Sequence, residues 1–316
     1  MPPTDAALLT GFRLRNAEQR LAVHGVHVHR EGHPPVEHRF RADDTVEVYS
    51  ASKTFAAVAV GIARAEGLLG LDDAVVEFFP GAPHADGAEA MTVRHLLHMS
   101  SGSTATWHTP VRGEEPDLLG AFLTAELVAE PGSRFFYSNA CSYVLGRIVH
   151  AVSGQDLRDY LVPRLFDPLG IGNPQWLRCP QGHSLGGVGL QLRTSELARL
   201  GRLLLQDGRW EGSSLVPADF VAAMHGDVVT AEGFPDPESQ AGYGYHVWGC
   251  TRFGAWRADG KYGQFSVVLP RHRAVVTTTA HHEGAQNDIL RAIWDEVVPL
   301  LTVQDPAGSA DTDSDS

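Results

Sequence analysis

Strand-like segments occur near both ends of the 316-residue chain, and helix-like segments fill the region between them. The alternating, β-branched stretches 21–29 and 36–40 predict an antiparallel hairpin. Stretches 243–248, 264–269 and 274–279 predict three further strands, separated by turns. Because distant strands need partners, the pattern predicts one antiparallel sheet built from both ends of the chain.

Helical patterns occupy the intervening region. Residues 52–66 are mostly helix formers, and an apolar stripe runs through Phe55, Val58 and Ile62. Further helices are predicted over residues 92–98, 139–153, 194–204 and 287–301. The helical region therefore reads as an insertion into the sheet and not as a separate tandem domain.

Together these patterns predict an α+β fold, an α/β sandwich in which helices flank the antiparallel sheet. A single domain is expected over residues 1–303, with sheet-forming parts at about 15–60 and 190–303 and a mainly helical insertion at about 61–189. The hydrophobic fraction of 43% is sufficient for a large core. Residues 304–316 are acidic, rich in serine and lack apolar anchors, which predicts a disordered tail.

The charge and the terminal sequence limit the classes of partner. A formal net charge of -13 argues against nucleic acid or an anionic membrane surface. No apolar stretch is long enough to span a bilayer, and the first residues lack the pattern of a secretory signal. Cys141, Cys179 and Cys250 are widely spaced, which is typical of buried, reduced thiols. A cytoplasmic protein is expected.

The first chemical motif is Ser50-Ala51-Ser52-Lys53, at the start of a predicted helix. Residues three apart share a helix face, so the Lys53 amine can reach the Ser50 hydroxyl. Free N–H groups at the helix N-terminus favour a developing oxyanion, and a lysine can act as a base only if burial or positive neighbours lower its pKa. A helix cap on Ser50 or Ser52 beside a solvated lysine explains the same short, common motif.

A second motif, Tyr137-Ser138-Asn139, directly precedes a predicted helix. In an extended segment Tyr137 and Asn139 point to the same side. The phenol can relay a proton where cations stabilise its anion, and the carboxamide can orient a lysine and a substrate amide together. An aromatic core strand with an asparagine helix cap accounts for the motif equally well.

The third motif, Ala258-Asp259-Gly260-Lys261, leads into the strand predicted at 264–269. A glycine on a strand edge permits close approach of a substrate, and the next backbone N–H can donate to the substrate carbonyl oxygen. A strand that ends in a tight turn is the structural alternative.

These motifs occur in the chain order of the serine β-lactamase and penicillin-binding protein superfamily, which the sequence resembles from about Arg20 to Leu301. The resemblance is closest to the branch of class C β-lactamases and related esterases, which carries Tyr-x-Asn as its second motif. Segments 68–73, 92–102, 186–190 and 208–212 also resemble that family.

The resemblance implies a role for each motif residue. Ser50 would be the acylated nucleophile and Lys53 its general base, while Tyr137 would shuttle a proton. Asn139 would hold Lys53 or the substrate. The backbone N–H groups of Ser50 and Lys261 would form the oxyanion hole, next to Gly260.

The third motif departs from the Lys-Thr-Gly or His-x-Gly usual in the family, because Ala258 stands at the cationic position. Asp259 beside it is expected to repel a substrate carboxylate. Lys261 or Arg257 could replace the missing cation only if a loop rearranged, since adjacent strand residues point to opposite faces. This departure argues against β-lactam and peptidoglycan substrates.

The sequence thus predicts a serine hydrolase that acts through an acyl-enzyme on Ser50, with a small-molecule carboxylic ester as substrate. Small amides and acyl transfer are close variants, and no metal or organic cofactor is required. A β-lactamase or D,D-carboxypeptidase is the alternative enzyme. A non-catalytic binding module on the same fold is the alternative from another class.

Overall fold

The computed structural model describes residues 7–107, 117–231, 233–234 and 236–301. Both the tail predicted at 304–316 and the first residues considered for a secretory signal lie outside these ranges. At the centre is a six-stranded antiparallel sheet in the order β2-β1-β10-β9-β8-β7. Its strands are β1 (Val23–Arg30), β2 (Val36–Arg39), β7 (Trp248–Gly249), β8 (Trp256–Gly260), β9 (Gln264–Leu269) and β10 (Ala274–Ala280).

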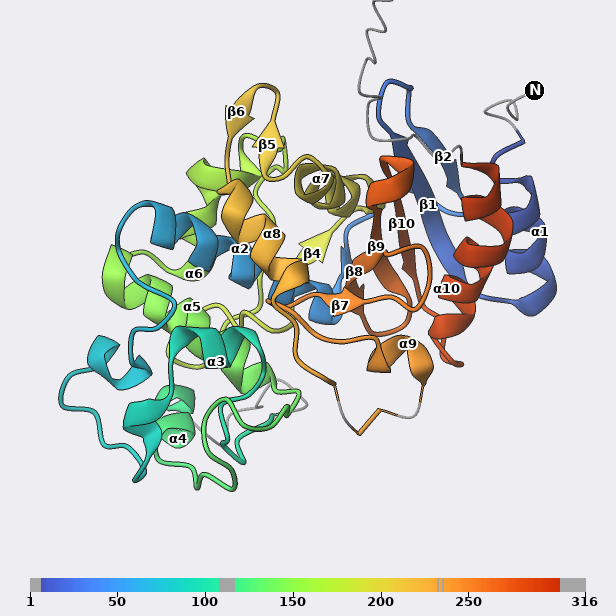
Figure 1. The fold of residues 1–316 in the computed structure, drawn as a ribbon. Coiled ribbons are helices and arrows are strands. Elements are labelled where there is room, and N and C mark those ends of the chain that lie inside the picture. Colours follow the sequence, from blue (N-terminus) through green and yellow to red (C-terminus); the bar gives the residue numbers. More distant parts are fainter. Residues whose placement is uncertain (1–6, 108–116, 232, 235, 302–316) are drawn as a thin grey trace, which may run out of the picture.

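The two ends of the chain meet inside this sheet, where β1 pairs with β10 and Val28 lies opposite Val276. Helices cover both faces (Figure 1). This arrangement confirms the α+β fold predicted from the sequence. Two short two-stranded ladders lie outside the main sheet: β3 (Val46–Glu47) with β4 (Gln191–Leu192), and β5 (Arg209–Trp210) with β6 (Ser213–Ser214).

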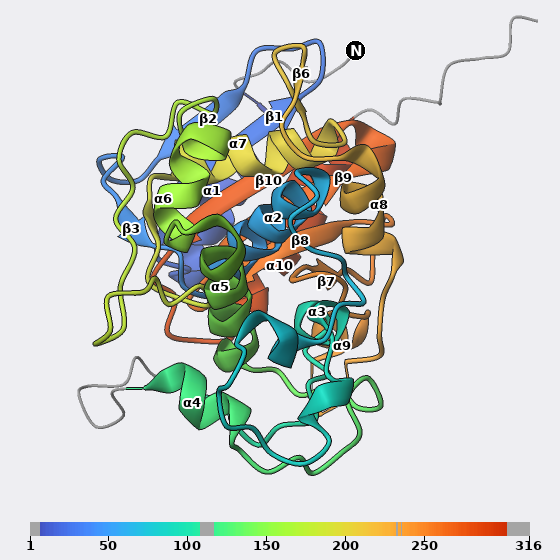
Figure 2. The ribbon, with the colours of Figure 1, turned by 90° about the vertical axis from the view of Figure 1, so that its left-hand side faces the viewer.

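The helices fall into two groups. Val268 and Val275, on one face of the sheet, belong to a large core shared with α2, α5 and α7. Val267 and Val276, on the other face, belong to a second core shared with α1 and α10. In Figure 2, α2 and α5 lie in front of the sheet. The α-helices are α1 (Thr10–Gln19), α2 (Ser52–Ala65), α3 (Val93–Leu97), α4 (Leu118–Leu123), α5 (Asn139–Ser153), α6 (Leu157–Leu161), α7 (Thr194–Leu205), α8 (Ala218–Gly226), α9 (Pro237–Gln240) and α10 (Asn287–Ala292). Short 3-10 helices occur at Tyr49–Ala51, Val75–Phe78, Ala88–Ala90, Pro270–His272 and Val298–Leu300, and π-helical turns at Val162–Phe166 and Ile293–Val297.

Three elements differ from the prediction. Helix α1 was not predicted, because Phe12 is its one buried residue and the apolar period is therefore weak. The strand expected over 243–248 is reduced to β7, since left-handed backbone at Gly242 and His246 interrupts the ladder. The helix expected over 287–301 changes to π and 3-10 turns after Ala292, where it approaches Pro299.

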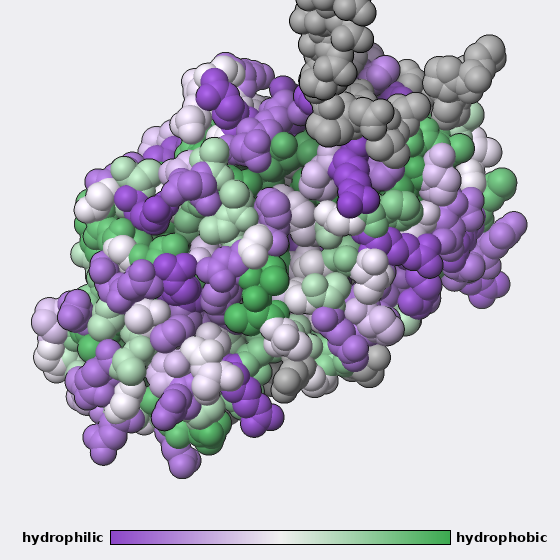
Figure 3. Space-filling view, viewed as in Figure 1, coloured by the Kyte–Doolittle hydropathy of each residue, from purple (hydrophilic) through white to green (hydrophobic). Residues whose placement is uncertain are grey.

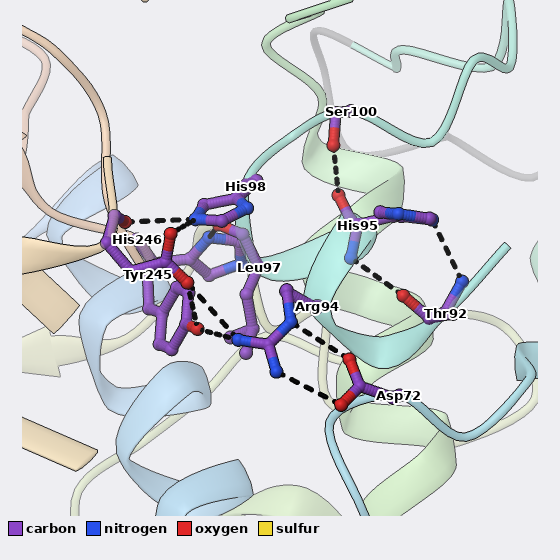
Figure 4. A network of polar contacts seen from close by, with 10 residues as sticks. Asp72, Thr92, Arg94, His95, Leu97, His98, Ser100, Tyr245 and His246 are labelled. Atoms are coloured by element: carbon purple, nitrogen blue, oxygen red, sulfur yellow. Dashed lines mark hydrogen bonds and ion pairs between the residues drawn. The ribbon is translucent and has the colours of Figure 1, made fainter. Parts of the chain in front are cut away.

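A polar network joins α3 to the loop that precedes β7 (Figure 4). Arg94 makes a two-point contact with Asp72 at 3.0 and 3.2 Å and also donates to the Tyr245 hydroxyl at 2.5 Å. The same hydroxyl donates to Asp227 at 2.5 Å, and His98 contacts the Asp227 carbonyl at 2.9 Å. These contacts fix the loop at Tyr245 against the helical region.

Hydrophilic residues are spread over most of the face in Figure 3, with smaller apolar patches between them. No helix among the described residues is long and apolar enough to cross a membrane. Cys141 and Cys179 are buried, Cys250 is half-buried, and all three thiols are free.

Candidate active site

Ser50 lies in a tight turn immediately before α2. Tyr49 has a left-handed φ of 47°, an uncommon conformation for a residue with a side chain. The turn is fixed because the Val48 N–H donates to the Leu190 carbonyl at 2.9 Å. Neither serine of the motif caps α2 through its side chain, since Ser52 Oγ instead accepts from the Leu190 N–H at 3.3 Å. The local structure therefore does not require Ser50 as a helix cap.

Lys53 lies in the first turn of α2, and its side chain is buried. Its Nζ is 3.1 Å from Ser50 Oγ, 2.5 Å from Asn139 Oδ1 and 2.8 Å from the Gly187 carbonyl. The carbonyl and carboxamide oxygens can only accept, so a neutral amine donates its two hydrogens to them. Its lone pair then faces the Ser50 hydroxyl, which is the geometry that a general base requires.

The protonation state of Lys53 supports this geometry. Burial lowers the pKa of the Lys53 amine to about 7, although Cys141 and Asp259 act in the opposite direction. A buried ammonium loses its hydration, and the neighbouring groups replace only part of it. Near neutral pH a substantial fraction of the lysine is therefore the neutral amine.

Asn139 is the first residue of α5, and the Ser138 side chain caps this helix by accepting from the Ala140 N–H at 3.0 Å. The Asn139 Nδ2 donates to the Trp107 carbonyl at 2.7 Å. Because that carbonyl cannot donate, the amide orientation is fixed and Oδ1 faces Lys53. The alternative of an asparagine cap is wrong, since serine occupies the cap position.

Tyr137 lies beside Lys53, whose Nζ is 4.9 Å from the ring centroid. The ring packs against Tyr243 and Trp248, with centroids 5.9 and 5.6 Å away. Burial raises the pKa of the Tyr137 phenol well above its usual value, and a hydrogen bond with Ser50 opposes this rise. At neutral pH the residue is thus a phenol, which can give a proton more readily than take one.

The third motif is arranged differently from the prediction. Strand alternation turns Asp259 toward the α10 side of the sheet, where Oδ2 accepts from the Arg257 Nε at 2.8 Å and Oδ1 from Gln286 at 3.1 Å. Both members of this ion pair are buried, and neither Asp259 nor Ala258 lines the pocket beside Ser50. The expectation that Ala258 and Asp259 line the substrate pocket is therefore wrong, and the Asp259 charge is paired with Arg257.

Lys261 instead lines the pocket, because β8 ends at Gly260 and the chain turns there. Its side chain is exposed, and its Nζ lies 4.6 Å from the centroid of the Tyr262 ring. The expectation that Lys261 would need a loop rearrangement to reach the site is thus also corrected. A cation does border the pocket, but from the turn after the strand.

Gly260 brings the end of β8 against the Ser50 turn. A Cβ at this position would lie 2.2 Å from the Val48 carbonyl oxygen and 3.2 Å from the Ala51 nitrogen. Gly260 itself does not line the pocket, so its contribution is the close approach of two backbone segments.

Gly260→Ala is accordingly expected to push β8 away from Ser50 and lower the free energy of unfolding by about 1–3 kcal/mol. Hydrolytic activity should fall more than folded content, because the displaced segment carries Lys261. Urea unfolding and activity measured on the same preparation test this, with Gly226→Ala as control since nothing lies within 4 Å of a Cβ there. Equal losses of stability and activity in the two variants would contradict the proposed clash between a Cβ at position 260 and the Ser50 turn.

The pocket has a volume of about 180 Å³ and is lined by Tyr49, Ser50, Tyr137, Asn139, Val188 and Lys261. Two larger hollows of about 710 and 900 Å³ border α7, and Ser50 lines neither. The smaller pocket is the candidate site because it is lined by Ser50, whose Oγ lies 3.1 Å from the buried Lys53 amine. Within the described part of the chain, no group of three or more His, Cys, Asp or Glu side chains could hold a metal ion.

Sequence reasoning missed the Gly187 and Trp107 carbonyls, because a backbone acceptor leaves no side-chain signature. It also missed Tyr49 and Val188 as pocket residues. One available signal was lysine usage: the whole sequence contains two lysines, Lys53 and Lys261, and the fold brings both to this site.

Comparisons with known proteins show which family the chain belongs to. The family model described as Beta-lactamase matches residues 20–297. A penicillin-binding protein of Bacillus subtilis (strain 168) is 27% identical over 42% of this chain and 30% of its own length. Lovastatin esterase of Penicillium rubens is 29% identical over 42% of this chain and 40% of its own length.

The chain thus spans less than half the length of these two curated relatives. Among solved structures, EstCE1, described as a hydrolase with promiscuous acyltransferase activity, superposes with a TM-score of 0.73 at 19% identity. That match covers 93% of this chain and 99% of the other, and it establishes the shared fold. Since the family model covers most of its length, the chain belongs to the Beta-lactamase family.

Proposed function

We propose that this protein is a serine hydrolase that cleaves small carboxylic esters through an acyl-enzyme on Ser50. The observation that carries the proposal is the placement of Lys53, whose Nζ is 3.1 Å from Ser50 Oγ and whose other two contacts are acceptors. A binding module without chemistry has no need for a buried, poorly solvated lysine in this position. The lovastatin esterase relative supports the ester class.

In the proposed mechanism, the Lys53 lone pair takes the Ser50 proton as Oγ attacks the carbonyl carbon of the ester. The backbone N–H groups of Ser50 and Lys261 are the proposed donors to the oxyanion. As the intermediate collapses, Tyr137 gives a proton to the leaving alkoxide, and the proton held by Lys53 restores the phenol. Water then attacks the acyl-enzyme while Lys53 takes its proton, and the carboxylic acid leaves as Oγ is reprotonated.

The substrate class follows from the size and charge of the pocket. A volume of about 180 Å³ is below the several hundred Å³ typical of sites for drug-sized ligands, which favours a short acyl group. An ester also has a better leaving group than an amide, and it needs no carboxylate anchor.

A second candidate, hydrolysis of a carboxylate-bearing β-lactam or D-alanyl peptide, is favoured by one observation. The exposed Lys261 borders the pocket, while Asp259 is paired on the other side of the sheet. An anionic substrate would therefore meet a cation at the rim of the site.

The test is a substrate panel with active-site labelling. The protein is incubated with p-nitrophenyl acetate, p-nitrophenyl octanoate, a chromogenic cephalosporin and a fluorophosphonate probe, and labelled peptides are identified by mass spectrometry. Acetate turnover above that of octanoate, with label on Ser50, is the expected result. Ser52→Ala, a matched serine of the same motif, should keep the label on Ser50. Label elsewhere, or faster cephalosporin turnover, contradicts the proposal.

The pH dependence follows from the Lys53 pKa of about 7. The neutral amine is the base, so log kcat/KM should rise with a slope of one below about pH 7 and level off above it. Stopped-flow hydrolysis of p-nitrophenyl acetate from pH 5 to 9 measures this rise. An activity that is flat across this range would mean that Lys53 does not titrate as the base.

A further inference from the structure

His246 lies in the loop before β7, and its side chain is buried, with 3% of the residue exposed. Its carbonyl accepts from the Thr54 hydroxyl of α2 at 2.8 Å. Its ring contacts two other helices: Nδ1 lies 3.0 Å from the Leu97 carbonyl at the end of α3, and Nε2 lies 3.0 Å from Ser142 Oγ on α5. One residue thus connects three helices.

These connections assign the proton on the ring. The Leu97 carbonyl can only accept, so Nδ1 carries the hydrogen. Nε2 then presents a lone pair, to which the Ser142 hydroxyl donates. Burial, and to a smaller extent the nearby charge of Lys53, lower the pKa of His246 to about 3. The ring is therefore neutral at neutral pH, and it satisfies a donor and an acceptor without adding a charge beside Lys53.

Two of these three helices, α2 and α5, carry Lys53 and Asn139. Thr54 follows Lys53 directly on α2, and Ser142 lies one turn after Asn139 on α5. The 2.5 Å contact between Lys53 Nζ and Asn139 Oδ1 therefore depends on how closely α2 and α5 approach each other. A relative shift of a few tenths of an ångström would change this contact and let water reach the amine.

The segment that carries His246 is itself fixed. The preceding residue, Tyr245, is anchored to Arg94 and Asp227 by the network described above (Figure 4). His246 adopts a left-handed φ of 57°, which histidine and asparagine tolerate better than most side chains. The titratable groups that face the ring are Lys53, His98 and Tyr243, whose hydroxyl is 3.4 Å from Nδ1.

We propose that His246 is a positioning residue, which holds α2 and α5 together so that the Lys53 amine stays dry and directed at Ser50. It touches no substrate and acts through the carbonyl contact to Thr54 and the ring contact to Ser142. This inference rests on the proposed function for its effect on catalysis. Its effect on the titration of Lys53 can be measured without any substrate.

The test uses two variants that break the same contact from opposite sides. His246→Asn keeps a donor near the Nδ1 position for the Leu97 carbonyl but cannot reach Ser142. Ser142→Ala removes only the small hydroxyl on α5, so it should fold even if the histidine variant does not. His246→Gln can still present an acceptor to Ser142 and is expected to retain more activity than His246→Asn. Ile148→Val, a core change on α5, is the matched control for a simple loss of stability.

The main readout is the titration of Lys53 by NMR of protein labelled with [13Cε]lysine. The chain has two lysines, so the spectrum contains two signals, and Lys261→Arg assigns them. We expect the Lys53 midpoint to rise by about one pH unit in His246→Asn and Ser142→Ala, because water reaches the amine. At pH 7, kcat should fall about five-fold, because the neutral fraction of Lys53 falls from about one half to about one tenth, with KM changed less than about two-fold. The double variant should shift the midpoint no further than either single variant.

The outcomes are separable. An unchanged Lys53 midpoint in both variants, with a loss of stability like that of Ile148→Val, overturns the positioning role. A shifted midpoint with unchanged kcat supports the positioning of Lys53 but shows that Lys53 is not the catalytic base, so the proposed function fails instead. A shifted midpoint that tracks a fall in kcat supports both.

Discussion

Ser50→Ala and Lys53→Met are each expected to lower kcat/KM for p-nitrophenyl acetate by about 10⁴- to 10⁶-fold. In the proposed mechanism Ser50 supplies the oxygen that forms the acyl bond, and Lys53, whose Nζ is 3.1 Å from Ser50 Oγ, is the base. Because the two residues act in one proton transfer, their effects should not add. The variant with both changes should be no slower than the slower single variant.

Steady-state kinetics and fluorophosphonate labelling check this result at several pH values. Lys53→Met should lose the labelling of Ser50 at neutral pH and regain part of it above about pH 9, where hydroxide can replace the amine. Thermal unfolding serves as the control. Removal of a buried amine should leave the melting temperature unchanged or raise it, whereas removal of a structural ion pair would lower it. If kcat/KM falls by less than 100-fold in either variant, the roles proposed for Ser50 and Lys53 are contradicted.

Arg257→Met is expected to lower the free energy of unfolding by about 3–5 kcal/mol, and Asp259→Asn by a similar amount. Arg257 is fully buried and donates to Asp259 at 2.8 Å and to the Gly249 carbonyl at 2.7 Å. Removing either partner leaves the other charge in a dry environment. Replacing both charges, as Arg257→Met with Asp259→Leu, should cost less than the sum of the single changes.

Urea denaturation of the single and double variants measures this coupling. Arg273→Met is the matched control, because Arg273 forms an ion pair with Glu31 on the surface and its side chain is 56% exposed. That exposed pair should contribute at most about 1 kcal/mol. If Arg257→Met lowers the free energy of unfolding no more than Arg273→Met does, the ion pair between Arg257 and Asp259 does not stabilise β8.

Several features were predictable because they depend on local sequence. Ser50 and Lys53 are three residues apart, so their side chains can meet on one helical turn. Tyr137 lies just before a helix whose first residue is Asn139. Alternating and β-branched stretches identify β1, β9 and β10, since period-two patterns directly reflect the two faces of a strand. No single motif was sufficient to indicate the family. The resemblance rests on the order in which the three motifs follow one another along the chain.

Other features depend on packing between distant segments. The sequence contains a lysine at position 53, but only the burial of α2 lowers its pKa to about 7. The Gly187 carbonyl reaches Lys53 from 134 residues away, and a backbone oxygen has no sequence signature.

The proximity of Ser50 and Lys53 was thus determined by the sequence itself, because residues three apart on a helical turn lie on the same face. Which charge enters the pocket was decided by the tertiary structure alone. Sequence reasoning placed Asp259 at the site, whereas the sheet turns Asp259 to Arg257 and the turn after Gly260 brings Lys261 to the rim. The direction of a side chain at a strand end depends on where the strand stops, and that is set by the close contact of Gly260 with the Ser50 turn.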